Sequence, residues 1–272
     1  QADWLVGMNA TRAYTTKYFK KLTVGRVQTP TLAMLVERAG QISNFQKEKY
    51  FNVELDCDGI PAVKPKIFDP DEAEQLRSRC QGSEAIVTAV KETEKKVKAP
   101  KLYDLTTLQR EANRIYGMTA KQTLDTAQSL YEKKLITYPR TDSQYLTEDM
   151  EQTARNVVRQ IYEKYQLTGP FDQPEQPDVK KVMNNSKVTD HHAIIPTMEL
   201  ASCHLGELKS WEEKILFLIA VHTVMAMSKD HIYQETEIEV ECQEEIFKAK
   251  GKIVLQDGWK LFENCFKNKD RM

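Results

Sequence analysis

The sequence lacks the features that mark several large classes of protein. Its five cysteines are scattered, and no two of them form a CxxC pair: Cys57, Cys80, Cys203, Cys242 and Cys265. This spacing predicts reduced thiols and no metal ligands, and it makes a small zinc-binding protein the weakest hypothesis. No apolar run reaches the roughly 20 residues that a membrane-spanning helix needs, and no signal peptide is recognised. We therefore expect a soluble, cytoplasmic protein without a membrane partner.

A strong net charge is also absent. The formal charge is −1, from 39 basic and 40 acidic residues. The distribution is uneven, because residues 1–50 carry eight basic side chains against three acidic ones. Phosphate binding needs a basic region, but an ordinary solvated face has the same composition. Charge alone therefore leaves nucleic-acid binding open.

Two helices are expected in the basic region. Residues 2–20 have helical apolar spacing, and four side chains supply an apolar face: Trp4, Leu5, Met8 and Tyr14. After a short connector, Thr29 and Pro30 predict the N-cap and the first position of a second helix. Gly40 is expected to end that helix.

A change to β structure is expected near Tyr50. Residues 50–57 alternate between apolar and polar side chains, which predicts a strand. Asp69 is expected to begin a short helix that ends near Gly82. A second strand over 85–92 and a charged linker over 91–101 complete this part.

The pattern then becomes helical. Helices are expected over 106–116, from Thr119 in a capping box with Gln122, and over 211–228, where Ser210 with Glu213 forms the cap. Thr147 is expected to cap a further long helix that reaches Tyr165. Residues 168–190 are expected to form a loop.

Period-two alternation returns after His231, with strands predicted near 238–242 and 247–255. The β-rich pieces, about 50–92 and 232–256, therefore flank a helical block over about 100–231. The simplest topology is a helical domain inserted into a β domain. The sequence has no internal repeats.

One candidate reaction centre is the segment from Thr137 to Ser143, with the sequence TYPRTDS. Pro139 forbids a continuing helix and favours an extended Tyr138. Arg140, two residues on, then points to the same side. A phenol beside a guanidinium is a sensible pair for phosphate chemistry, since one attacks phosphorus and the other clamps the oxygens. Thr141, Asp142 and Ser143 could position that pair, although a Tyr before Pro is usually a packing residue.

Two further segments are candidates. His191 and His192 could donate hydrogen bonds to phosphate or carry protons, while an ordinary hydrogen-bonded loop is the alternative. Arg26 could pair with a phosphate brought close to Gly25, beside the free N–H groups of the following helix. Either segment by itself is weak support.

The combination is more specific. In order along the chain stand ADWLVGMN at 2–9, VGRVQTP at 24–30, YDLTTLQR at 103–110, TYPRTDS at 137–143 and HHAIIPT at 191–197. This resembles the type IA DNA topoisomerases along essentially the whole chain. The HHAIIPT and YDLTTLQR forms resemble bacterial topoisomerase III rather than topoisomerase I.

The resemblance implies roles for single residues. Tyr138 matches the nucleophile that forms a 5′-phosphotyrosine link to one DNA strand. Arg140 and His191 match the catalytic residues that orient the scissile phosphate and assist cleavage. The matching positions for contact with single-stranded DNA are Thr23, Val24, Gly25, Arg26, Val27, Gln28, Thr141, Asp142, Ser143 and His192.

The resemblance also implies an architecture. Residues 1–49 and 258–272 match parts of a single-strand-binding domain, and residues 50–99 and 232–257 match an antiparallel β arch that acts as a gate. Residues 100–231 match the helical domain that carries the tyrosine. An enzyme of this kind cleaves, passes and reseals one strand without ATP.

One part of the family pattern is not found. The family binds Mg²⁺ through a Toprim domain with a DxDxE motif, whereas the acids from Asp69 to Glu74 miss that spacing and fit a helix N-terminus better. We therefore expect a fragment that holds no cofactor of its own and is inactive without the Toprim domain of the same polypeptide. The expected partner is single-stranded DNA, and the protein is expected to be a monomer in a bacterial cell, associated with nucleoid or plasmid.

Two alternatives stay open at this point. The chain could be a non-catalytic single-stranded DNA-binding module that uses residues 1–50, with an affinity that falls as salt rises. A tyrosine recombinase also combines Tyr with Arg and His. It would need two well-separated arginines and a 3′ link, and the order of the motifs here fits it poorly.

Overall fold

The computed structural model describes residues 1–167 and 177–267. The chain divides into two compact units, one formed by residues 1–54 with 63–83 and the other by residues 55–62 with 84–272. Each unit is described by itself. Part of the loop expected over 168–190 lies outside the described residues. The domain boundaries that the family resemblance implies stay a prediction.

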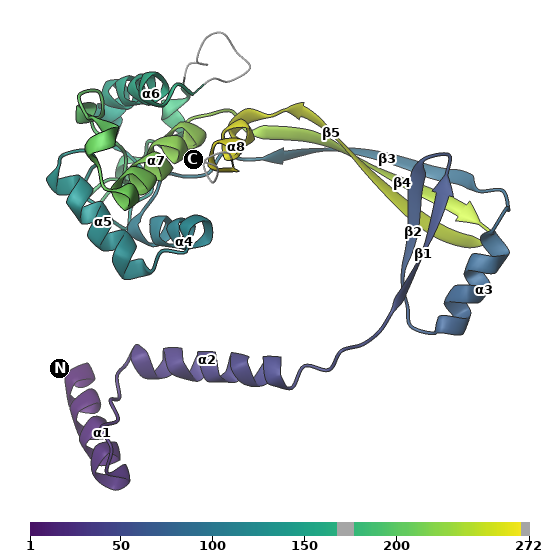
Figure 1. Ribbon diagram of the computed structural model, residues 1–272, viewed down its shortest axis with the longest axis horizontal. Coiled ribbons are helices and arrows are strands. Elements are labelled where there is room, and N and C mark those ends of the chain that lie inside the picture. Colours follow the sequence, from purple (N-terminus) through teal and green to yellow (C-terminus); the bar gives the residue numbers. More distant parts are fainter. Residues whose placement is uncertain (168–176, 268–272) are drawn as a thin grey trace. The chain divides into compact units, whose positions relative to one another are not determined.

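The first unit begins with two helices, as predicted (Figure 1). Helix α1 spans Ala2–Tyr18 and helix α2 spans Gln28–Ser43. The connector is held to α1 by threonine side chains, since the Val24 N–H donates to Thr11 Oγ1 at 2.9 Å and the Leu22 N–H donates to Thr15 Oγ1 at 3.2 Å. No residue of either helix is buried.

The bounds expected for α2 were wrong at both ends. The helix starts at Gln28, with Val27 as its N-cap, so Thr29 and Pro30 lie inside the first turn. The Thr29 hydroxyl instead accepts from the Gly25 N–H at 3.1 Å. At the other end, Gly40 lies within the helix, which continues to Ser43. A glycine inside a helix costs about 1 kcal/mol, and the residues around Gly40 outweigh that cost.

A hairpin and a short helix follow along the chain. Strands β1 (Phe51–Cys57) and β2 (Ile60–Ile67) are joined by a turn at Asp58 and Gly59, whose φ angles are 51° and 88°. Two positive φ angles in a row are typical of the tight turns that join antiparallel strands. Strand β2 was not predicted, because its two prolines argue against a strand.

Helix α3 spans Pro70–Cys80, and Asp69 caps it by accepting from the Asp71 N–H at 2.9 Å. The predicted helix start is therefore confirmed, and the acids after Asp69 belong to its first turn. The buried side chains of this unit come from the hairpin and α3: Val53, Ile67, Ala73, Leu76 and Cys80.

The sheet contains five strands in the order β1-β2-β5-β4-β3. Strands β3 (Ile86–Val97), β4 (His231–Cys242) and β5 (Glu245–Gln256) pair antiparallel and form a long twisted ribbon that leads away from the helices of the second unit (Figure 1). The linker was expected over 91–101, but residues 91–97 belong to strand β3, so that part of the prediction was wrong. Lysines of β3 face acids of β4, as in the pair of Lys91 with Glu237, so a charged segment that looks like a linker is stabilised as a strand.

The helical part of the second unit contains α4 (Leu105–Tyr116), α5 (Ala120–Glu132), α6 (Glu151–Tyr165) and α7 (Ser210–Ala226). Short 3₁₀ turns and the one-turn helix α8 (Asn264–Lys267) connect and follow them. The 3₁₀ turns are Glu148–Met150, Val179–Val182, Asn185–Lys187, Met198–Leu200, Leu205–Glu207 and Gly258–Glu263.

Two of the expected helix caps need correction. Thr147 precedes a 3₁₀ turn and makes no capping hydrogen bond with its side chain. Helix α7 begins at Ser210, and the capping carboxylate is that of Glu212, which accepts from the Lys209 N–H at 3.0 Å, rather than that of Glu213. The capping box of Thr119 with Gln122 is confirmed.

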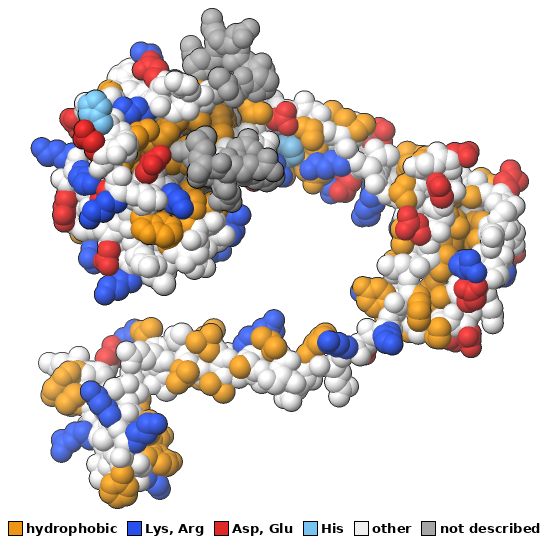
Figure 2. Space-filling view, viewed as in Figure 1, with side chains coloured by type: hydrophobic (Ala, Val, Ile, Leu, Met, Phe, Trp, Pro, Cys, Tyr) orange, Lys and Arg blue, Asp and Glu red, His pale blue; other side chains and the backbone are white. Residues whose placement is uncertain are grey.

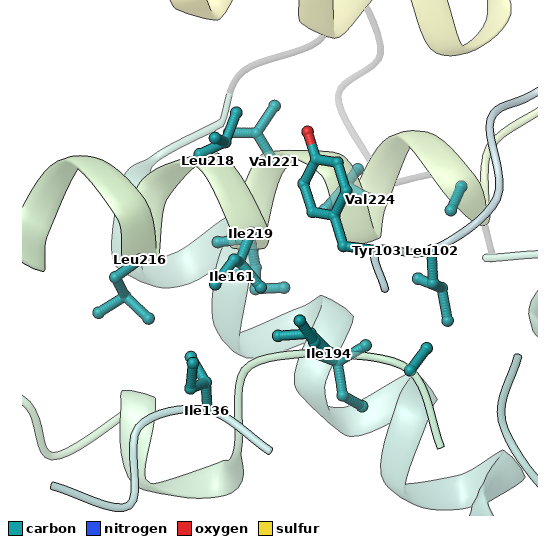
Figure 3. Packing of buried hydrophobic residues seen from close by; sticks show 14 of the residues in the cluster. Leu102, Tyr103, Ile136, Ile161, Ile194, Leu216, Leu218, Ile219, Val221 and Val224 are labelled. Atoms are coloured by element: carbon teal, nitrogen blue, oxygen red, sulfur yellow. The ribbon is translucent and has the colours of Figure 1, made fainter. Parts of the chain in front are cut away.

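The core of the second unit surrounds α7, which is buried along most of its length. Figure 3 shows Leu216, Ile219 and Val224 of this helix in one cluster with Ile136 and Ile194, which come from two separate loops. The two loops are therefore fixed to the core on their inner side. Within the described residues, no helix is both long and apolar enough to cross a bilayer.

Candidate active site

Tyr138 lies on a loop that begins where α5 ends at Glu132. Ile136 forms an isolated antiparallel bridge with Pro196, and Pro139 is buried directly after the tyrosine. Helix termination and a buried proline leave the Tyr138 side chain only half-buried. The helix therefore ends well before Pro139, and Tyr138 lies in the loop that follows it.

Thr137 joins the loop that carries Tyr138, here called the tyrosine loop, to the loop that carries His191, here called the histidine loop. Its N–H donates to the Ile195 carbonyl at 3.0 Å, and its hydroxyl donates to the Ala193 carbonyl at 3.0 Å. The same hydroxyl accepts from the Ile195 N–H at 3.0 Å. Three hydrogen bonds therefore act through one residue beside Tyr138, and each is worth about 1 kcal/mol. The sequence analysis did not identify Thr137, although it belongs to the TYPRTDS motif.

The fold brings Tyr138 and His191 together, although 53 positions separate them in the sequence. Their ring centroids lie 4.4 Å apart, with the rings tilted by 48°. Tyr131 packs edge-on against Tyr138 from the last turn of α5, at 5.3 Å between centroids. A phenol between an imidazole and a second aromatic ring is held in position but still reaches solvent.

Two residues predicted to contact DNA serve the loop structure. Thr141 is buried, and its hydroxyl donates to the His191 carbonyl at 3.0 Å. Ser143 is also buried, and its hydroxyl donates to the Lys187 carbonyl at 2.8 Å. These bonds fix the histidine loop relative to the tyrosine loop. Asp142, between them, is exposed.

Arg140 and His192 have different surroundings. Arg140 is exposed, and its guanidinium has no ion pair or hydrogen bond with any residue that the structure describes. It is therefore available to an anion from outside. His192 is half-buried, and its Nδ1 lies 2.9 Å from the Ala193 carbonyl. A carbonyl oxygen only accepts hydrogen bonds, so Nδ1 is the donor in this contact. The other ring nitrogen, Nε2, takes no part in it.

The segment from Thr23 to Gln28 belongs to the first unit. Arg26 is exposed and forms an ion pair with Asp3 of α1. The backbone N–H groups of Val24 and Gly25 already donate to Thr11 and Thr29. The Arg26 side chain could reach a phosphate after it separates from Asp3, and the exposed Thr23 and Gln28 side chains are further polar groups of the segment.

The described residues offer no site for the Mg²⁺ that the resemblance implies. Among them, no three side chains of His, Cys, Asp or Glu are grouped as a metal ion would require.

Comparisons with known proteins show the family of this chain. The model of the DNA topoisomerase family matches residues 1–272, so the chain belongs to that family. DNA topoisomerase 3 of Bacillus licheniformis is 41% identical over 275 residues, which is 96% of this chain and 37% of the relative. DNA topoisomerase 3 of Bacillus subtilis is 40% identical, with 96% of this chain and 37% of the relative covered.

A solved structure supports the same conclusion. Full-length topoisomerase I from Thermotoga maritima superposes with a TM-score of 0.71 at 27% identity, and the match covers 95% of this chain and 43% of that one. The mixed fold with an antiparallel sheet is therefore confirmed. The resemblance to DNA topoisomerases of the topoisomerase III kind, drawn from the motifs, is also confirmed.

Proposed function

We propose that this chain supplies the cleaving tyrosine of a type IA DNA topoisomerase, an isomerase that breaks, passes and reseals one strand of DNA. The observation that carries the proposal is the placement of Tyr138 against His191 at 4.4 Å between ring centroids. Two loops from distant parts of the sequence hold these rings together through Thr137 and Thr141. Such a construction fits a reaction centre better than accidental packing.

The proposed reaction is a transesterification. The Tyr138 oxygen attacks a backbone phosphorus, a Tyr–O–P bond forms to the 5′ side, and the bond from phosphorus to the 3′ oxygen breaks. The phenol loses its proton, and the leaving 3′ oxygen gains one. Resealing is the reverse step and needs no ATP, because the phosphotyrosine link keeps the phosphodiester energy.

Arg140 and His191 have separate roles in this proposal. Arg140 is exposed and unpaired within the described residues, so its guanidinium can bind the nonbridging oxygens of the phosphate. His191 lies beside the phenol and would donate a hydrogen bond or move a proton at the reacting oxygens. His192, Thr141, Asp142 and Ser143 are proposed to shape the path of the strand.

We further propose that activity belongs to a longer protein. The chain spans 37% of the length of the two Bacillus relatives. Large apolar side chains of α1 and α2, such as Trp4 and Leu35, are exposed (Figure 2). The coverage supports a protein longer than this chain, and the exposed side chains offer a surface for its other parts. The complete protein is proposed to be a bacterial, cytoplasmic enzyme whose Mg²⁺ is held by a Toprim domain outside this chain. The enzyme is proposed to act as a monomer on nucleoid or plasmid DNA.

The test is a covalent-adduct assay with end-labelled single-stranded DNA. The complete protein with Mg²⁺ is expected to form an adduct on its 5′-phosphate side, and this chain alone is expected to form none. Tyr138→Phe should abolish the adduct, whereas Tyr131→Phe, which removes the hydroxyl of the neighbouring ring, should keep it. An adduct that persists in Tyr138→Phe would refute the proposal, and a 3′ link would favour a recombinase.

A second candidate is a non-catalytic module that binds single-stranded DNA. The observation that favours it is the basic composition of residues 1–50, which hold eight basic residues against three acidic ones. In that case Arg26→Ala should weaken binding and Tyr138→Phe should leave it unchanged, with no adduct under any condition.

A further inference from the structure

Beside the reaction centre, two lysines share one tyrosine ring. The Lys101 ammonium lies 5.4 Å from the centroid of the Tyr145 ring, and the Lys187 ammonium lies 5.0 Å from the same centroid. These residues come from three separate segments of the second unit. We call them the Lys101–Tyr145–Lys187 cluster.

Each member of the cluster is anchored through its backbone. The Lys101 carbonyl accepts from His222 Nε2 at 2.7 Å, and the Lys187 carbonyl accepts from the Ser143 hydroxyl at 2.8 Å. The Tyr145 carbonyl accepts from the Ala193 N–H at 2.9 Å. The fold therefore holds the three backbones in place, and only the ends of the long side chains remain adjustable.

The positive charges of the cluster are not neutralised. Neither lysine forms an ion pair with a carboxylate in the part of the chain that the structure describes, and both side chains are exposed. Two ammonium groups near one ring repel each other unless an anion lies between them. A π face and a phenol hydroxyl attract each cation but leave the total charge unchanged.

The cluster is directly connected to the reaction centre. Ser143, which holds Lys187, also donates its N–H to Thr141 Oγ1 at 3.1 Å, and Thr141 holds His191. Ala193, which holds Tyr145, accepts from Thr137 beside the nucleophile. One hydrogen-bonded network therefore sets the position of the lysines relative to Tyr138 and His191.

We propose that the Lys101–Tyr145–Lys187 cluster is a phosphate-binding subsite for the single-stranded DNA that enters the reaction centre, gripping a backbone phosphate other than the one that Tyr138 attacks. This inference rests on the proposed function. Two ammonium groups suit the oxygens of one phosphodiester, and the phenol hydroxyl adds a hydrogen-bond donor. The cluster positions the strand and takes no part in bond breaking.

The titration behaviour of Tyr145 fits this proposal. Partial burial would raise the pKa of its phenol, but hydrogen bonds and charge from Lys101 and Lys187 outweigh burial and lower it. A bound phosphate would draw the ammonium groups toward itself and add negative charge. The pKa of Tyr145 should therefore rise when the subsite is filled.

The first test measures binding of a fluorescent oligothymidylate to this chain by anisotropy, over a range of salt concentrations. Each phosphate contact contributes about 0.7 to the slope of log affinity against log salt for single strands. Because the two lysines share one phosphate, the double variant Lys101→Gln, Lys187→Gln should lose about 0.7 from that slope and bind about 10-fold or more weakly at low salt.

Lys214→Gln is the matched control. The Lys214 ammonium also lies over aromatic rings, at 4.8 Å from Trp211 and 5.6 Å from Tyr116, but on α7 rather than beside the reaction loops. This variant should keep the wild-type slope. Equal slopes in wild type and double variant would overturn the subsite while the proposed function stands. No binding by the wild-type chain at low salt would overturn single-strand binding by this chain and the subsite together, whereas the adduct assay on the complete protein tests the proposed function separately.

A second measurement needs no lysine variant, so it holds even if the double variant fails to fold. In the chain labelled with ¹³C-tyrosine, the Tyr145 signal is the one missing from Tyr145→Phe. Adding oligothymidylate should raise its pKa, and an unchanged pKa with DNA bound would overturn the subsite. If inorganic phosphate at the same phosphate concentration raises the pKa equally, the cluster is a general anion site and the assignment to a DNA strand is overturned.

Discussion

Helices α2 and α7 have nearly the same length, 16 and 17 residues, but opposite surroundings. Helix α7 buries twelve residues in the core of the second unit, whereas no residue of α2 is buried. Helix α1 is like α2 in this respect. Apolar spacing therefore predicts that a helix forms, but it does not predict what covers the helix. Among the described residues, nothing covers the apolar side chains of α1 and α2.

A pair of leucine substitutions tests the difference between α7 and α2 most directly. Leu218→Ala removes a fully buried side chain of α7, and we expect a loss of ~2 to 5 kcal/mol in the free energy of unfolding. Leu32→Ala removes a side chain of α2 that is 60% exposed and should change stability by less than about 0.5 kcal/mol. Urea unfolding followed by circular dichroism measures both. Equal losses would mean that α2 is covered in solution.

The next effect concerns His222 of α7. Burial lowers the pKa of its imidazole to about 4, and its Nε2 donates to the Lys101 carbonyl. Because the folded pKa lies below the ordinary value near 6.5, the unfolded chain takes up the proton first as pH falls. The stability contribution is therefore complete above pH 6.5 and decreases toward pH 4, by up to ~3 kcal/mol.

Unfolding of wild type and His222→Gln from pH 7.5 to 4.5 checks this expectation. Glutamine keeps a hydrogen-bond donor but has no proton to gain, so the variant should lose most of this pH dependence. An identical pH dependence in the two proteins would contradict it.

A somewhat smaller effect is expected at Glu212, which joins α7 to α5. Burial would raise the pKa of this carboxyl, but hydrogen bonds from Lys133 Nζ at 2.6 Å, Ser129 Oγ at 2.7 Å and the Lys209 N–H lower it to about 2. A lowered pKa stabilises the fold above the ordinary value near 4.5, and that stabilisation is lost as pH falls toward 2. Glu212→Gln should cost ~2 kcal/mol at pH 7.

The matched control for Glu212 lies in the first unit. Glu74 pairs with Arg77 on α3 at 2.6 Å, but both side chains are exposed. Glu74→Gln should produce no measurable change in urea unfolding, because solvent screens an exposed pair. A similar loss in both variants would show that burial of Glu212 does not set its contribution.

The smallest effect is expected at the hydrogen bond between Thr11 of α1 and Val24 of the segment that follows α1. Thr11→Val removes the acceptor of the Val24 N–H and should cost about 1 kcal/mol locally. Hydrogen exchange at the Val24 amide should then become ~5-fold faster, with exchange in α7 unchanged. Faster exchange at both the Val24 amide and the amides of α7 would show that the two units unfold together.

Local signals in the sequence predicted much of the fold. Asp69, Thr119 and Gly117 end or begin helices through contacts with residues two to four positions away, so a short window contains the information. Strand β2 was missed because Pro61 and Pro65 usually exclude a strand. The end of β3 was missed because its lysines are stabilised by acids of β4, more than 130 positions away.

Some features of the candidate site are also visible in the local sequence, whereas others depend on distant residues. Tyr138, Arg140 and His191 stand in motifs that a single sequence displays, whereas the contact of Tyr138 with His191 is visible only in the folded chain. The buried roles of Thr141 and Ser143 depend on carbonyl groups of another loop. Lys101, Tyr145 and Lys187 form no local pattern, so only the folded chain brings them together.

The three hydrogen bonds of Thr137 have a further consequence. Because they join the two loops beside Tyr138 and His191, phenol and imidazole form a single preassembled half of a reaction centre. Any other half then has to dock against one rigid face, and the entropy lost in aligning two independent loops is not paid again in each catalytic cycle. In the proposed function, repeated separation and reunion of the halves would leave the register of Tyr138 and His191 unchanged.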